Sequence, residues 1–524
     1  GLIDRWKNRG LNPGDLDAVE NEAYANGRGA QFYKLYQDRL KTLNACDFGD
    51  LLLHILNIFR DHRDVLEQYQ QRFKYILVDE YQDVNRSSVR LLQRLTDGGR
   101  NLWAVGDARQ AIYRFRGASS YNMSRFATDD FAGATGGRLR LNYRSTPEIV
   151  DAFSAFGQGM RAGSNDASLG ADRPASGLAP EHVTFGDNDD EAAALADEIE
   201  RRSGDTAFRD HAVLCSGNDR LTRIGRELER RGIPVLYLGN LFERPEIKDL
   251  LSLLSLLVDR RAMGLVRKPT LEGLATGMTL AGATAVVQHL GTANAEPLAW
   301  TQSAWASPEL SPADAKSLQR MIEMLDGFGI SSRPWSVLAR ILLDRTRTAA
   351  SIATTGDVAS RAMGVAIWQF MGFVRAERAG RGLPVQRMLD GIRRLVQLAD
   401  ERDLRQLPQA AQGIDAVRLM TIHGSKGLEF PVVHVMGLNK NSLPTSSATR
   451  RPTCPVPDGM ITGGEGNESG TMALAAIDHD LEQECLFYVA ASRARDRLLL
   501  YSSTRTASSG TGSPRRRDPS PFIA

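Results

Sequence analysis

The sequence predicts an α/β protein in which parallel sheets alternate with helices and a helical domain is inserted. Two short apolar runs, residues 75–78 and 102–105, flank a segment of helical spacing at 89–95 that stops at a pair of glycines. Strand, helix and strand in this order, with apolar and buried-looking strands, favour a parallel sheet. Further apolar runs of strand length follow at residues 211–215, 432–436 and 498–501.

The strand signal fades between residues 258 and 412. Apolar residues there recur at helical spacing, as in 317–325 and 388–396, which predicts amphipathic helices. We therefore expect a helical domain inserted into an α/β domain. Residues 163–180 are rich in Gly, Ala, Ser and Asp and predict a loop, and the end of the chain is basic and of low complexity.

Length and composition narrow the class of protein. A chain of 524 residues, 42% hydrophobic and 24% charged, is typical of a globular protein with about three or four domains. Lys plus Arg number 65 against 63 Asp plus Glu, so the overall charge excludes a histone-like binder. Affinity for a polyanion must come from local placement of charge.

The spacing of the cysteines indicates the redox compartment, and the length of the apolar runs indicates whether the chain could span a membrane. The four cysteines lie far apart and form no Cys-x-x-Cys pair: Cys46, Cys215, Cys454 and Cys485. This spacing argues against a disulfide framework or a zinc ribbon and fits the reducing cytoplasm. No apolar run approaches the roughly 20 residues that a membrane helix needs, so we expect no membrane partner.

Two adjacent acids, Asp79 and Glu80, follow the first apolar run. Open α/β sheets bind ligands at the carboxyl ends of their strands. Because consecutive strand side chains point to opposite sides, one carboxylate can hold Mg²⁺ and the other can orient and deprotonate water. A strand end with solvated acids is the alternative, and for a lone Asp-Glu pair it is the commoner one.

A second polar segment, residues 106–118, follows the next apolar run. It combines a glutamine, three arginines and two aromatic rings: Gln110, Arg109, Arg114, Arg116, Tyr113 and Phe115. Rings interleaved with cations suit single-stranded nucleic acid, since rings stack on bases and guanidinium groups meet phosphates. The alternative is a pair of core rings beside a solvated basic loop.

Three more segments are weaker when taken singly. Tyr143 stands beside Arg144 in residues 141–147, a glycine-bracketed polar turn lies within 417–430, and arginines occur in a helical segment at 482–496. A ring can cover a base and an arginine can reach a phosphate. Surface arginines on a helix are nevertheless usually solvated.

In this order the five segments resemble motifs II to VI of superfamily 1 DNA helicases of the UvrD/Rep branch. Residues 47–52 and 241–249 are lesser matches, and residues 488–496 look closer to the helicase parts of RecB and AddA enzymes. The resemblance implies two RecA-like parallel-sheet domains of the P-loop NTPase class. It places ATP between them and single-stranded DNA across them.

The resemblance also implies a division of the chain. We expect residues 1–46 to end a helical insert of the first domain, 47–140 to form part of the first RecA-like domain, 141–257 and 413–505 to form the second, 258–412 to form the helical insert, and 506–524 to form a basic tail.

The residue roles are carried over by motif position. Asp79 would hold Mg²⁺, Glu80 would be the catalytic base, and Gln110 would sense the γ-phosphate of ATP. Arg144 and Arg493 would be arginine fingers that neutralise charge in the transition state.

The same positions imply contacts to the nucleoside and to DNA. Tyr143 would stack on adenine and Glu429 would meet the ribose. The residues expected along the DNA path are Tyr113, Phe115, Arg116, Thr421 and His423. Because both fingers would come from the second domain, hydrolysis would require closure between the domains.

The chain departs from the family pattern in one large respect. No Gly-x-x-x-x-Gly-Lys-Ser/Thr phosphate loop occurs in it, and it does not begin with Met. We expect an N-terminally truncated chain; loss of ATP binding, or its supply by a partner, is the alternative. Smaller departures are Phe115 for Trp, Ala111 for Ser, and Glu484 with Cys485 for paired arginines.

The expected function is that of an ATP-dependent 3′–5′ helicase or translocase. It would act on single-stranded DNA and duplex junctions, with protein partners in a repair or recombination complex, and this chain alone is expected to be inactive. A non-catalytic DNA-binding or scaffold subunit is the alternative. The motor part of a helicase–nuclease is a third and minor one.

Overall fold

The structure is a computed structural model and describes residues 2–16, 27–113, 121–163, 169–237, 241–259, 263–292, 309–355, 358–376, 382–397, 415–445, 470–506 and 515–523. Two compact units divide the chain, one of residues 1–191 and 425–524 and the other of residues 192–424. The domain boundaries expected above remain a prediction.

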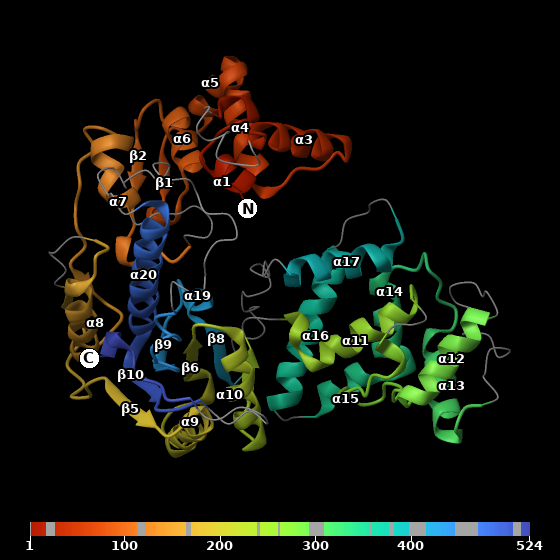
Figure 1. Cartoon of the computed structure of the whole chain (residues 1–524). Helices are drawn as coiled ribbons and strands as arrows, with labels where there is room; N and C mark the ends of the chain where they lie inside the picture. Colours follow the sequence, from red (N-terminus) through yellow and green to blue (C-terminus); the bar gives the residue numbers. More distant parts are fainter. Residues whose placement is uncertain are drawn as a thin grey trace. The chain divides into compact units, whose positions relative to one another are not determined.

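Among the described residues the first unit opens with the helices α1 (Leu2–Asn8), α3 (Gly29–Thr42), α4 (Phe48–Asp61) and α5 (Arg63–Arg72) (Figure 1). Lys7 is fully buried among them, with its ammonium 2.7 Å from the carboxylates of Asp47 and Asp50. Asp47 also caps α4 by accepting from the Asp50 backbone. A Cβ at Gly49 would lie 2.8 Å from the Cβ and Cδ atoms of Lys7, so glycine makes room for the aliphatic stem of the buried lysine.

A short parallel pair follows, β1 (Ile76–Val78) and β2 (Leu102–Ala104), joined through α6 (Arg86–Leu95). One face packs on a cluster that includes Tyr81, Val89 and Phe131. On the other face Leu77 and Trp103 are register partners and are 78% and 70% exposed. The strands and the helix form where the sequence predicts them, but the expectation of buried strands is wrong for this face, because the described residues cover only the opposite one.

The rest of the first unit is built on a second set of parallel strands. Its elements are β3 (Leu141–Asn142), α8 (Pro147–Gly159), β4 (Gly170–Ala171), β5 (Glu181–Phe185), β9 (Phe430–Val435), α20 (Gly470–Ala491) and β10 (Ala494–Ser503). Strand β10 lies between β5 and β9 and is parallel to both. Helix α20 packs against α8, β9 and β10 (Figure 1). The apolar runs predicted at 432–436 and 498–501 thus lie largely within strands.

Part of the C-terminal tail is packed against this unit. The Arg517 backbone donates to the Thr504 carbonyl at 2.7 Å. The Phe522 ring lies 5.4 Å from Phe156 and 5.6 Å from Phe487, measured between ring centroids. Residues 507–514 lie outside the described residues. The aromatic anchor explains why residues 515–523 pack despite their basic, low-complexity composition.

The second unit combines three parallel strands with a group of helices. The strands are β6 (His211–Cys215), β7 (Val235–Tyr237) and β8 (Val417–Thr421), with β8 paired to both others. The helices are α9 (Asn188–Arg202), which begins in the first unit, α10 (Asn218–Arg230), α11 (Pro245–Leu256), α12 (Leu280–Thr292), α13 (Pro312–Leu325), α14 (Pro334–Ala339), α15 (Thr348–Thr354), α16 (Val358–Ala376), α17 (Pro384–Gln397) and α19 (Ile422–Ser425).

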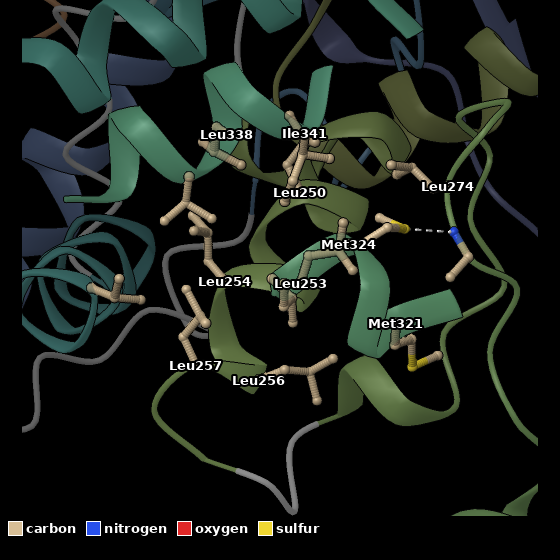
Figure 2. Close-up of a cluster of buried hydrophobic side chains, with 14 of the residues drawn as sticks. Leu250, Leu253, Leu254, Leu256, Leu257, Leu274, Met321, Met324, Leu338 and Ile341 are labelled. Carbon is tan, nitrogen blue, oxygen red and sulfur yellow. Dashed lines mark hydrogen bonds between the residues drawn. The ribbon is translucent and has the colours of Figure 1, made fainter. Parts of the chain in front are cut away.

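Leucines of α11 form the centre of the helical core. Figure 2 shows Leu250, Leu253 and Leu254 facing side chains from α13, α14 and the following π-helical turn. The Met324 sulfur accepts a hydrogen bond from the Ala275 backbone at 3.3 Å. The helices predicted at 317–325 and 388–396 lie within α13 and α17. No helix in the described part of the chain is long and apolar enough to span a membrane.

A buried histidine gives this unit a pH-dependent stability. His211 begins β6 and is fully buried, and burial, followed by nearby Arg202, lowers its pKa to about 4. The unfolded chain takes up a proton near pH 6.5, whereas the folded chain does so only near pH 4. The contribution of His211 to the free energy of unfolding is therefore fully present above about pH 6.5 and is lost as the pH falls toward 4. The loss is roughly 1–2 kcal/mol at pH 5.

The histidine effect is measured by urea denaturation at pH 7 and pH 5 for the wild type and for His211→Leu. We expect the variant to lose less stability than the wild type on acidification. A His211 ring proton that titrates near pH 6.5 in NMR spectra would contradict the prediction.

Candidate functional site

The end of β1 places Glu80 in an unusual backbone conformation. Asp79 is exposed, and its carboxylate accepts from the Glu80 backbone at 2.8 Å. Glu80 has φ 53° and ψ 45°, in the left-handed region that side chains other than glycine rarely adopt. Such strain concentrates at functional sites. It is held by the next residue, Tyr81, whose ring is fully buried.

A chain of hydrogen bonds joins the ends of β1 and β2. The Gln82 amide donates to the Glu80 carboxylate, and its oxygen accepts from the Asp107 backbone at 2.9 Å. The Asp107 carboxylate in turn accepts from the Gln110 amide at 3.0 Å. A Cβ at Gly106 would lie 2.5 Å from the Gln82 oxygen. Glycine is therefore what allows this chain of bonds to form.

Arg493 lies at the far end of the same chain of bonds. Its side chain is 2% exposed, and its guanidinium donates to the Gln110 amide oxygen at 3.2 Å. The same group donates to the carbonyls of Leu428 at 3.3 Å and Val489 at 3.1 Å. The arginine is thus held rigidly at the end of α20, with one edge against the predicted γ-phosphate sensor.

A second arginine lies close by. Arg144 follows β3, and its guanidinium is 2.8 Å from the Glu429 carboxylate and donates to the Ser492 carbonyl at 3.0 Å. Burial, and next the positive charge of Arg144, lower the pKa of Arg493 to about 10. Two cations are held together at a cost in electrostatic energy. A multiply charged anion such as a phosphate would relieve it.

A solvent-open cleft of about 720 Å³ is lined in part by Arg144. Its volume is within the usual range of small-ligand pockets. The lining residues are Leu141, Asn142, Tyr143, Arg144, Arg173, Glu429 and Arg495. The Tyr143 ring is 70% exposed, so one face of it is accessible for stacking. The cleft therefore unites the residues predicted to meet adenine and ribose with one predicted finger.

Lys426 is a site residue that the motif-based assignment missed. Its ammonium lies 2.6 Å from the Asp83 carboxylate and 3.3 Å from that of Glu80, and donates to the Gln110 carbonyl at 2.7 Å. The side chain is almost fully buried. The sequence signal for Lys426 was its position in the glycine-bracketed polar turn within residues 417–430. A buried cation is costly unless it has partners, so a buried lysine in such a turn needs acidic or carbonyl groups beside it.

The two departures near Arg493 have structural partners. The Glu484 carboxylate pairs with Arg161 at 3.3 Å and accepts from its backbone at 3.1 Å. The Cys485 thiol is buried and lies 3.7 Å from the Ala108 carbonyl. Burial raises the pKa of that thiol to about 12, so Cys485 serves packing rather than nucleophilic chemistry.

The predicted DNA contacts are only partly described. Tyr113 lies beside Lys426, with the ammonium 5.3 Å from the ring centroid. Phe115 and Arg116 lie outside the described residues. Thr421 ends β8 and His423 lies in α19, both in the second unit, where the Thr421 hydroxyl accepts from the Gly424 backbone at 3.2 Å.

Both halves of the chain match known helicase domains. Residues 1–131 match the UvrD/REP helicase N-terminal domain, and residues 138–290 and 378–505 match the UvrD-like helicase C-terminal domain. The chain belongs to the UvrD-like helicase family. The family resemblance and the RecA-like, P-loop NTPase fold class predicted from the sequence are thereby confirmed.

Relatives of this UvrD-like helicase chain carry helicase names. It is 28% identical over 468 residues to an ATP-dependent DNA helicase PcrA of Leuconostoc citreum, covering 86% of this chain and 60% of the relative. It is 29% identical over 475 residues to PcrA of Bacillus subtilis, at 85% and 60% coverage. Against the ATP-dependent DNA helicase UvrD1 of Mycobacterium leprae it is 29% identical over 532 residues, at 94% and 63%. The chain thus spans about three fifths of these relatives.

Proposed function

We propose that this UvrD-like helicase chain is part of an ATP-dependent motor that moves 3′ to 5′ on single-stranded DNA and unwinds duplex junctions. One observation carries the proposal. Gln110 is bonded through Asp107 and Gln82 to Glu80 on one side, and directly to Arg493 on the other. A glutamine between a carboxylate and a buried arginine is placed to respond to a terminal phosphate.

The residues fit part of a nucleotide and its metal. Mg²⁺ needs only one or two carboxylates in addition to phosphate oxygens and water, which Asp79 would supply. Among the described residues no group of three or more His, Cys, Asp or Glu side chains is arranged to hold a metal ion. Bound Mg²⁺ would neutralise charge on the phosphates. Tyr143 and Glu429 would hold the nucleoside, and Glu80 would accept the proton of the attacking water.

The two arginines would act together on the transferred phosphate. Arg144 and Arg493 already lie close enough for the first to lower the pKa of the second. Approach of both to the phosphate would neutralise transition-state charge. We infer that closure of the two RecA-like domains brings them there and that repeated closure moves DNA.

We expect the 524 residues by themselves to turn over almost no ATP, because they contain no Gly-x-x-x-x-Gly-Lys-Ser/Thr string. The measurement is phosphate release by the purified chain with and without an oligothymidylate. Strong DNA-stimulated release that Glu80→Gln abolishes would contradict this expectation, and would at the same time support Glu80 as the base.

The proposed motor itself is tested by DNA binding. We expect tighter binding to a single-stranded oligonucleotide than to a blunt duplex in a fluorescence-anisotropy titration, since stacking needs unpaired bases. Equal affinity, or none, would count against the proposal. A non-catalytic DNA-binding or scaffold subunit is the second candidate, favoured by the missing phosphate-loop string. We propose that this protein acts in the cytoplasm, within a repair or recombination complex.

A further inference from the structure

The cleft that Tyr143 lines also contains two arginines to which the motifs assign no role, Arg173 and Arg495. One carboxylate holds both of them. The Arg173 guanidinium lies 2.8 Å from one oxygen of the Asp496 carboxylate, and the Arg495 guanidinium lies 2.9 Å from the other. The Arg173–Arg495 pair is thus held together at the cleft by a single acid.

The backbone anchors Arg173 as well. Its guanidinium donates to the Arg144 carbonyl at 2.9 Å and to the Arg495 carbonyl at 3.0 Å. A guanidinium has five N–H donors, so these two bonds and the ion pair to Asp496 leave donors for a ligand. Arg173 is therefore fixed in position before any ligand binds.

The side chains that line the cleft offer mainly donors to a base. The Asn142 amide oxygen already accepts from the backbone N–H groups of Arg144 at 2.9 Å and Ser145 at 2.8 Å. The Glu429 carboxylate is paired with Arg144 at 2.8 Å and is assigned to the ribose. A base stacked on Tyr143 would therefore meet N–H groups, and the edge that faces them has to present acceptors.

Purines carry such acceptors on their N7 edge. Guanine presents N7 and O6, to which one arginine can donate two hydrogen bonds, whereas adenine presents N7 beside its N6 donor. Stacking itself does not distinguish the bases, because every base has a π-face. Guanidinium donors at this edge thus select for N7 and do not reject guanine.

We propose that the Arg173–Arg495 pair is a specificity-determining site that reads the N7 edge of a purine stacked on Tyr143, so that the cleft accepts guanine nucleotides as well as adenine nucleotides. The proposal rests on the proposed function, because it takes Tyr143 as the ring that carries the base.

The test uses nucleoside monophosphates, which probe the cleft without the contacts of a triphosphate. Binding of AMP, GMP and their 7-deaza analogues to the full chain is titrated by NMR saturation transfer at fixed salt. In the analogues a C–H group replaces N7, so the shape of the base is kept and one acceptor is lost. We expect GMP to bind at least as tightly as AMP. Each analogue should bind about two- to tenfold more weakly than its parent, from one lost hydrogen bond.

Arg495→Met tests the pair directly, because it removes one guanidinium and keeps an unbranched side chain. The loss of affinity caused by 7-deaza substitution should shrink in this variant, and likewise in Asp496→Asn, which releases both arginines. Arg100→Met is the matched control, since Arg100 is an exposed arginine of the first unit that does not line the cleft. Its removal should leave every Kd unchanged.

The outcomes separate the N7 site from the function on which it rests. If AMP binds and replacement of N7 has no effect, the N7 site is overturned. Equal weakening of parents and analogues in Arg495→Met would overturn it too, because the pair would then meet the phosphate rather than the base. Binding of AMP without binding of GMP would overturn the acceptance of guanine. AMP binding that is absent, or that survives in Tyr143→Ala, would overturn the proposed nucleoside site itself.

Discussion

Phe115→Ala should weaken binding to single-stranded DNA by about 1–3 kcal/mol, roughly a five- to 150-fold rise in Kd, because a base loses its stacking partner. Phe115 stands in a run of rings and arginines at residues 113–116. Nucleotide contacts are assigned to other residues, so they should be unaffected. The measurement is a fluorescence-anisotropy titration with an oligothymidylate at fixed salt, since phosphate contacts make the affinity depend on salt.

Phe48→Ala is the matched control for the stacking variant. Phe48 is an aromatic residue in the first turn of α4, outside the five motifs, and it is 78% exposed. Its removal should leave the Kd unchanged. Equal losses in both variants would indicate a general effect on folding or solubility, and an unchanged Kd for Phe115→Ala would exclude that ring from the DNA path.

Gly106→Ala should lower the free energy of unfolding of the first unit by about 1–3 kcal/mol, as overpacking typically does. The new methyl group would lie 2.5 Å from the Gln82 oxygen, 2.8 Å from the Met123 sulfur and 3.1 Å from the Tyr81 backbone nitrogen. Gln82 must then move, and its bonds to Glu80 and Asp107 break. Urea denaturation monitored on the first unit measures the loss.

Gly136→Ala is the control for this loss, because a methyl group there would meet nothing within 4 Å. We expect it to stay within about 0.5 kcal/mol of the wild type. A double-mutant cycle with Gln82→Ala then isolates the clash, since Gly106→Ala should cost less when the glutamine is already absent. Equal stability of the two glycine variants would show that Gln82 is not held where the structure places it.

The sequence predicts the strands and helices that carry strong periodicity. The run at 211–215 coincides with β6, and those at 432–436 and 498–501 lie largely within β9 and β10. The two-residue strands β3 and β4 were not predicted, because two residues show no alternation. The sequence also could not reveal that Leu77 and Trp103 face solvent, since covering of a strand face depends on what packs against it.

The motifs identify most residues of the candidate site, and the structure adds the hydrogen bonds and ion pairs that connect them. Glu80, Gln110 and Arg493 were named from their motifs, and their roles remain predictions. The contributions of Gln82, Asp107 and Lys426 depend on contacts between segments up to several hundred residues apart. Spacing along a single chain does not encode such contacts, whereas a motif encodes the identity of each residue.

The exposed pair Leu77 and Trp103 on β1 and β2 provides an intrinsic fluorescent probe. Trp103 is 70% exposed beside Leu77, so its indole emits in a watery environment. Whatever settles on that apolar face displaces the water and moves the emission of this one tryptophan to shorter wavelength. Aggregation or partner binding at this face should therefore add a blue shift to the combined emission of the six tryptophans.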